Sequence, residues 1–106
     1  MVTLEEFKKL ELKIARIKEV KDHPNADKLY VVIIELADKT KQVVAGIKNF
    51  YKKEDLAGRQ VVVLDNISPA TLRGVESQAM LLVAQDENGV SILAPDREVK
   101  IGSPVK

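Results

Sequence analysis

Residues 10–20 read LELKIARIKEV, and this stretch decides the fold class. Its first half alternates apolar and charged residues with a period of two, which predicts a strand with one buried face. The alternation slips after Ala15, and apolar residues resume at Ile17 and Val20. A phase change within a strand predicts a β-bulge, the irregularity that lets a strand curl around a barrel.

The residues on either side of this strand set its ends. Upstream, Thr3 and Glu6 have the spacing of a capping box, which predicts a short helix over residues 3–10. Downstream, the sequence DHPN at residues 22–25 ends the strand, because proline donates no ladder hydrogen bond and Asp and Asn favour turns. Further strands are predicted at residues 28–36, 40–45, 60–66 and 78–84, with a short sixth strand at 90–94.

Five main strands without a long amphipathic helix predict an all-β Greek-key barrel. An SH3-like barrel has similar strand lengths, so periodicity leaves two barrel types open. A helical turn is expected near residues 53–57, closed by Gly58, and its place between the third and fourth strands favours the OB-fold. The length of 106 residues predicts a single domain, residues 1–106.

Composition argues against export, a membrane anchor and catalysis. The chain has no cysteine, its first ten residues include four charged ones, and its longest apolar run, residues 29–34, is too short to span a bilayer. His23 is the only histidine, and without cysteine it cannot build a typical zinc site. A Ser-His-Asp triad is formally possible with Ser68 or Ser77, but the sequence has no nucleophile elbow. It has no glycine-rich phosphate loop either. We therefore expect a cytoplasmic protein with no catalytic residue, metal or cofactor, and no membrane partner.

Charge is unevenly distributed along the chain although the net charge is only +1. Residues 39–59 carry six basic and two acidic side chains, whereas residues 81–106 carry three basic and four acidic ones. One face could therefore be basic and bind nucleic acid, or the lysine-rich stretch could simply be a solvated loop.

An OB-fold makes a geometric prediction for binding. Oligonucleotides bind such barrels on the face of strands two and three, between the loops that join strands one to two and four to five. These loops are residues 22–27 and 67–76, so they should meet at one rim. Lys28 and Arg73 could contact phosphates there. Hydrogen bonds to a nucleic acid could come from Asn25, Asn66, Ser77 and Gln78. For the two asparagines, stabilisation of a turn is an equally good interpretation. The apolar pattern around Met80 favours a position in the core.

The small number of aromatic residues restricts the kind of nucleic acid. Binders of plain single strands use aromatic side chains on which bases stack. Only four aromatic residues are present, and Phe7 is expected to be buried by its helix. A polar, lysine-rich face suits a folded RNA read through its shape and backbone.

Four segments in register resemble one known family. HPNADKLY at residues 23–30, VVAGI at 43–47, NISP at 66–69 and RGVESQAM at 73–80 are similar to motifs of the tRNA-binding domain family. That family includes the carboxyl-terminal domain of methionyl-tRNA synthetases, stand-alone structure-specific tRNA-binding proteins and the endothelial monocyte-activating polypeptide. Ala45 stands where the family usually has serine, which removes one hydroxyl from that position.

The resemblance, which covers roughly residues 7–105, implies a non-catalytic OB-fold that grips the tRNA elbow by shape. The same resemblance implies that the domain raises the tRNA affinity or the local tRNA concentration of an aminoacyl-tRNA synthetase, with methionyl-tRNA synthetase as the expected one. It also implies a homodimer in which residues 1–10 and 95–106 complete the interface. The alternatives are a chaperone-like polypeptide-binding barrel and a protein-interaction arm of a synthetase complex. The expected RNA-facing residues are Asn25, Lys28, Lys41, Lys48, Asn66, Arg73, Ser77, Gln78 and Met80. The expected dimer residues are Leu4, Phe7, Leu10, Val99, Ile101 and Val105.

Overall fold

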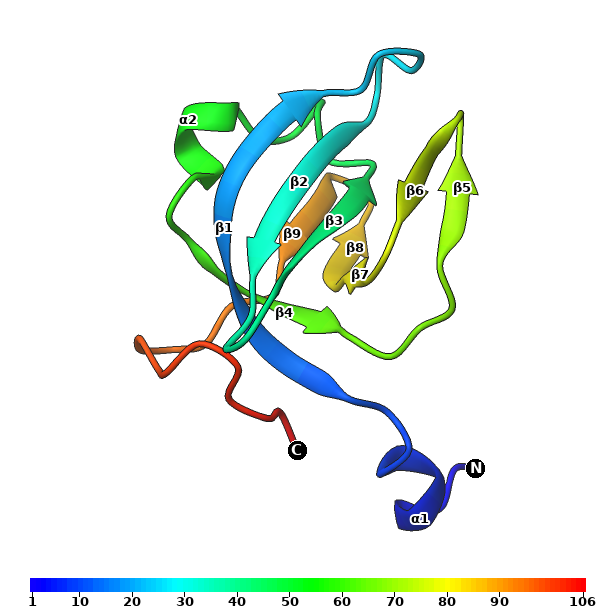
Figure 1. Cartoon of the computed structure of the whole chain (residues 1–106), viewed down its shortest axis with the longest axis vertical. Helices are drawn as coiled ribbons and strands as arrows, with labels where there is room; N and C mark the ends of the chain where they lie inside the picture. The colour runs from blue at the N-terminus through cyan, green and yellow to red at the C-terminus, as the bar shows by residue number, and fades with distance from the viewer.

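The computed structural model describes residues 1–106, and its longest strand is β1, Leu12–Asp22 (Figure 1). The first half of β1 pairs antiparallel with β4, Gln60–Leu64, and its second half pairs with β2, Tyr30–Glu35. The register against β2 shifts between Ile17 and Glu19, so Lys18 is the extra residue of a β-bulge. The predicted bulge is confirmed, and it lies where β1 passes from one partner strand to the other.

A five-stranded sheet of order β3-β2-β1-β4-β7 forms the barrel, with β3 at Thr40–Ala45 and β7 at Met80–Leu81. The two edge strands, β3 and β7, lie against each other and nearly close the sheet. The helical turn α2, Lys53–Leu56, connects β3 to β4, and its Leu56 is fully buried. The predicted OB-type barrel, with a helical turn in this position, is confirmed.

Two hairpins complete the chain, and both correct the sequence prediction. Residues 67–76, expected to be a loop, contain most of the hairpin of β5, Ala70–Leu72, and β6, Val75–Ser77. The strand expected at 78–84 is divided into β7 and β8, Val83–Asp86, and β8 pairs with β9, Gly89–Ile92. The division falls at Leu82, whose N–H donates to Val62 O while its own carbonyl accepts from Leu93 N–H, so the chain changes partner strand at this residue.

The two ends of the chain lie near each other at one end of the molecule (Figure 1). Helix α1, Leu4–Phe7, is shorter than predicted, because the N–H groups of Lys9 and Leu10 bond only three residues back. The predicted capping box of Thr3 and Glu6 is present. The carboxyl-terminal segment pairs with the free edge of β1, through Ile14 N–H to Ser103 O at 2.9 Å and Val105 N–H to Leu12 O at 2.8 Å.

The core occupies the interior of the barrel. Inward-facing side chains of β1 to β4, mostly Val and Ile, supply most of it, as the alternating pattern requires. No helix is long and apolar enough to cross a membrane. The largest fully buried side chains are Ile17, Val32, Ile34, Val43, Ile47, Leu56, Val61 and Val63.

Candidate nucleic-acid interface

The β1–β2 connection and the β5–β6 hairpin meet and are joined by three hydrogen bonds. The His23 ring is 6% exposed; its Nδ1 accepts from Asn25 N–H at 2.9 Å, so Nε2 carries the proton and donates to Leu72 O at 2.9 Å. The Asn25 side-chain amide donates to Arg73 O at 3.1 Å, and the Arg73 guanidinium donates to Asn25 O at 3.2 Å. The predicted meeting of the two loops is confirmed, and we call this contact the rim.

The tip of the hairpin holds an arginine in an unusual backbone conformation. Arg73 has φ 52° and Gly74 has φ 88°, so both central residues of the turn are left-handed, as a type I′ hairpin turn requires. Asparagine or glycine is the usual choice at the first position, and a bulky residue there costs on the order of 1 kcal/mol. The bonds with Asn25 stabilise this conformation and hold the guanidinium beside the loop.

The rim presents two cations that form no ion pair with a carboxylate. Lys28 and Arg73 are both exposed, and neither has an acidic partner. Lys48 differs, because its ammonium lies 3.2 Å from Asp22, which also binds Lys53 at 2.9 Å. Hydrogen bonds from Lys53 and Lys48 lower the pKa of the Asp22 carboxyl.

Three further expected RNA-facing side chains, Ser77, Gln78 and Asn66, form hydrogen bonds within the protein itself. Ser77 is buried, and its Oγ accepts from Val44 N–H and donates to Ala79 O, both at 3.0 Å. Gln78 Oε1 accepts from Gln42 N–H at 2.9 Å. These residues attach the hairpin to β3.

Asn66 is the third such residue. Its Oδ1 accepts from Glu11 N–H at 2.9 Å, and its Nδ2 donates to Lys9 O at 2.7 Å. The amide therefore secures the segment between α1 and β1. For Asn66, Ser77 and Gln78 a direct contact with RNA stays a prediction. Their observed hydrogen bonds hold the hairpin and the segment before β1 in place.

Met80 lies on the surface at an apolar hollow. Its side chain is 46% exposed, although the pattern of the strand alone favoured a buried position. The hollow has a volume of about 310 Å³ and lies between the end of β3, the β5–β6 hairpin and β7. Its lining includes Ile47, Ile67, Leu72, Met80 and Val83.

The aromatic residues offer no row of stacking surfaces. Tyr30 is buried and its hydroxyl donates to Tyr51 O at 2.8 Å, while the Tyr51 hydroxyl accepts from Ile92 N–H at 3.0 Å. Phe50 is exposed, and Phe7, expected to be buried by its helix, is only half-buried.

A buried carboxylate that the sequence reasoning missed lies at the end of β4. Asp65 is 4% exposed, and the ammonium groups of Lys13, Lys41 and Lys39 lie 2.7, 2.7 and 3.2 Å from its oxygens. Burial alone would raise the pKa of Asp65, but bonds from Lys13, Lys41 and Lys39 outweigh it and hold the pKa well below its usual range. The sequence contained a signal, since Asp65 continues the inward-facing series of Val61 and Val63, and a carboxylate at such a position needs partners.

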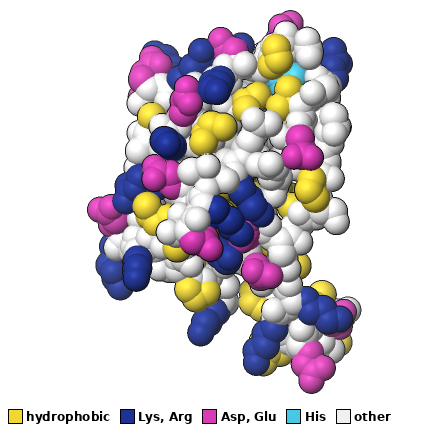
Figure 2. Space-filling model, in the orientation of Figure 1, with side chains coloured by type: hydrophobic (Ala, Val, Ile, Leu, Met, Phe, Trp, Pro, Cys, Tyr) yellow, Lys and Arg dark blue, Asp and Glu magenta, His cyan; other side chains and the backbone are white.

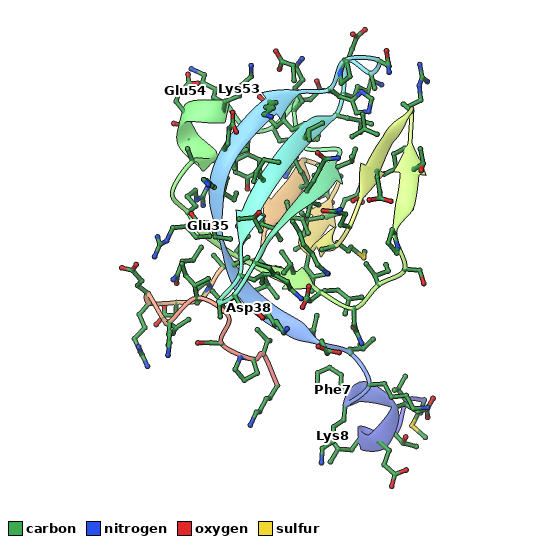
Figure 3. All side chains as sticks on the ribbon, viewed as in Figure 1. Phe7, Lys8, Glu35, Asp38, Lys53 and Glu54 are labelled. Carbon is green, nitrogen blue, oxygen red and sulfur yellow. The ribbon has the colours of Figure 1, made fainter.

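The two ends of the chain form an apolar groove of about 410 Å³. Leu4, Phe7, Leu10 and Val105 line this groove, and Figure 3 shows Phe7 on α1. The remaining two expected dimer residues, Val99 and Ile101, do not line it; Val99 instead exchanges two hydrogen bonds with the Gln60 side chain.

The hydrogen bonds of the His23 ring are all with the main chain. Neither ring nitrogen reaches a serine hydroxyl. No group of three or more His, Asp or Glu side chains could hold a metal ion.

Comparison with known proteins gives one consistent family. The family model described as "Putative tRNA binding domain" matches residues 12–104. The methionine–tRNA ligase of Thermococcus kodakarensis is 52% identical over 105 residues, which are 99% of this chain and 14% of the ligase. The chain thus spans about one seventh of the length of the curated relatives that it matches.

Solved structures agree with this comparison. A MetRS-related protein from Pyrococcus horikoshii superposes with a TM-score of 0.92 at 29% identity, covering 100% of this chain and 98% of that one. The CsaA chaperone protein from Picrophilus torridus superposes with a TM-score of 0.93 at 30% identity, covering both chains completely.

Proposed function

The chain belongs to the tRNA-binding domain family, and from this premise we propose that it binds tRNA without catalysing a reaction, largely by shape and backbone contacts. The observation that carries this proposal is the rim, where Arg73 and Lys28 present unpaired cations on two loops fixed to each other. Phosphate contacts position an RNA without reading its sequence, so little preference among tRNA species is expected.

The proposed role of binding is to supply tRNA to a synthetase. The ligase relatives favour methionyl-tRNA synthetase as the partner, attached to this domain or acting separately in the cytoplasm. A weak RNA site held near an active site raises the local tRNA concentration there without a new contact in that site. A modest affinity suits this role, because a very tight site would slow tRNA release.

Binding of a labelled tRNA transcript, followed by anisotropy across salt concentrations, tests the proposal. Log affinity should fall linearly with log salt, by about 0.7 to 0.9 for each phosphate contact. Arg73→Ala and Lys28→Ala should each weaken binding and reduce this slope. Arg97→Ala and Lys100→Ala are the matched controls, because they remove the same side chains from exposed positions on the carboxyl-terminal segment, and they should bind as the unaltered chain does. No binding at low salt, or equal losses in the control variants, would contradict the proposal.

We also propose that the chain forms a homodimer through the terminal groove. Leu4 on α1 is 66% exposed, and it lines the groove together with Phe7, Leu10 and Val105. A second copy would remove these apolar side chains from water. Sedimentation at tens of micromolar should give a dimer, and Leu4→Glu should give a folded monomer. A monomeric unaltered chain would overturn the dimer.

Polypeptide binding is the second candidate function, and the apolar hollow at Met80 favours it together with the similarity to the CsaA chaperone protein. Met80→Glu tests it, because a carboxylate in the hollow would abolish capture of a labelled unfolded polypeptide. Capture that survives Met80→Glu, or that requires Arg73 in place of the hollow, would count against this function.

A further inference from the structure

The lysine cluster around Asp65 joins three separate parts of the barrel. Lys13 comes from β1, Lys39 and Lys41 come from the start of β3 and the turn before it, and Asp65 follows β4. Figure 2 shows Lys and Arg side chains gathered in the middle of one face of the molecule. Unlike Lys28 and Arg73, these lysines are brought together by a single carboxylate.

Asp65 is a poor choice for stability alone. The two preceding residues on the same face of β4, Val61 and Val63, are fully buried, and an apolar side chain would continue that face. A carboxylate there loses its hydration, and although its ion pairs outweigh that loss, a buried ion pair seldom stabilises a fold more than well-packed apolar side chains of similar volume. Its effect is to hold three ammonium groups close together against their mutual repulsion.

The cluster keeps hydrogen-bond donors for a further anion. Each lysine ammonium has three N–H donors. Lys41 donates one hydrogen bond to the Asp65 main-chain oxygen at 2.9 Å and lies in ion-pair contact with Oδ1 at 2.7 Å, whereas Lys39 contacts Asp65 only at Oδ2. Lys13 also lies 3.6 Å from Glu11, so the three lysines and two carboxylates sum to a charge of +1.

An open groove of about 500 Å³ gives access to these donors. Lys39 and Lys41 form one side of it, with the Thr40 and Ser68 hydroxyls, and Gln78 and Glu76 line it from the hairpin. The Glu76 carboxylate accepts a hydrogen bond from the Gln78 side chain at 3.1 Å. The groove is polar, unlike the hollow at Met80.

The groove and the rim lie along the same hairpin. Gln78, beside the groove, is five residues from Arg73 at the tip, which is about 16 Å of extended chain. Two hydrogen bonds fix the hairpin to β3. The Gln42 side chain donates to Glu76 O at 2.8 Å, and Gln78 N–H donates to Gln42 O at 2.8 Å. One duplex arm with a phosphate every few ångströms can therefore reach both places.

We propose that the groove at Lys39 and Lys41 is a second phosphate-binding site for the RNA backbone and that Asp65 is its positioning residue. This inference rests on the proposed tRNA binding and adds a site about 16 Å from the rim. Asp65 itself does not touch the phosphate; it holds the ammonium groups of Lys39 and Lys41 at the groove.

The decisive test exploits the sign of a charge change. Asp65→Asn removes a negative charge, so by net charge alone it would tighten binding of a polyanion. If Asp65 positions the lysines, the same substitution weakens tRNA binding, by about tenfold for the loss of one charge-assisted contact. Asp38→Asn is the matched control, since it makes the same charge change at an exposed position in the β2–β3 turn (Figure 3). The control should bind tRNA as tightly as the unaltered chain or slightly more tightly.

A second variant guards against a folding defect in Asp65→Asn. Lys39→Gln alters an exposed side chain; it should weaken binding and reduce the salt slope by about 0.7 to 0.9. Its loss should add to that of Arg73→Ala in the double variant, because the two sites are far apart. The second site is overturned, and the rim stands, if the unaltered chain binds tRNA and Arg73→Ala weakens this binding while Lys39→Gln does not. The same conclusion follows if a folded Asp65→Asn binds tRNA as tightly as Asp38→Asn. An unaltered chain that binds no tRNA overturns the proposed function itself.

Discussion

Replacing His23 by alanine should detach the β1–β2 connection from the hairpin. The ring makes two hydrogen bonds to main-chain groups, Asn25 N–H and Leu72 O, each 2.9 Å long. Each such bond contributes about 1 kcal/mol, and removing a buried ring leaves a cavity that costs about 1 kcal/mol more. We therefore expect His23→Ala to lower the free energy of unfolding by about 3 kcal/mol, against a typical total of about 5 to 15 kcal/mol.

A graded series separates the two hydrogen bonds. His23→Asn places an oxygen near the position of Nδ1, where it can accept from the N–H two residues on, but it does not reach Leu72. This variant should lose roughly half as much stability as His23→Ala. Urea unfolding followed by far-ultraviolet circular dichroism measures both, and an unchanged m-value shows that the unfolded reference is the same. The reasoning fails if His23→Ala stays within about 0.5 kcal/mol of the unaltered chain.

The same series connects the rim to RNA binding. Once the loop is detached, Arg73 loses the Asn25 contacts that hold its guanidinium. His23→Ala should therefore weaken tRNA binding, and adding it to Arg73→Ala should cause little further loss, because both act through one contact. Full additivity in the double variant would show that His23 does not act by positioning Arg73.

The remaining predictions concern acid stability and the backbone. Because Asp65 has a lower pKa in the folded chain than in the unfolded chain, its stabilisation is complete above the unfolded value of about 3.9 and is lost as the pH falls below it. The stability difference between the unaltered chain and Asp65→Asn should thus stay constant from pH 7 to about pH 5 and shrink as the pH falls from about 4 to about 2 in urea titrations, and a difference that stays constant down to about pH 2 would contradict this. Gly102→Ala puts a Cβ 2.6 Å from the Ala37 Cβ at φ +87°, so it should cost about 2 to 3 kcal/mol and loosen the carboxyl-terminal segment, measured by hydrogen exchange. Gly58→Ala, at φ +89° with nothing within 4 Å, should cost only the backbone term of about 1 kcal/mol, and equal losses at the two glycines would refute the steric argument.

Local sequence patterns were sufficient for the elements that depend on near neighbours. The phase change between Ala15 and Val20 predicted the bulge, and Thr3 with Glu6 predicted the cap of α1. These features follow from side-chain alternation and from bonds three residues apart, so no distant part of the chain was needed.

The points where the chain passes from one partner strand to another could not be predicted from local sequence patterns. Apolar residues run through 79–83 without a turn signal, yet the chain leaves β4 for β9 at Leu82. The hairpin of β5 and β6 was missed because its turn, Arg73-Gly74, lacks the usual asparagine or aspartate at the first position.

The sequence by itself determined the barrel, the family and the two loops that meet at the rim. Only the tertiary structure decided what individual polar residues do there. Asn66, Ser77 and Gln78 form hydrogen bonds with other parts of the protein. Lys13, Lys39 and Lys41 converge on Asp65 from segments up to 52 residues apart. Whether a polar group faces solvent or another part of the protein depends on long-range partners, because burial without a partner costs more than a hydrogen bond returns. Those partners are set by the folded barrel and not by any local pattern.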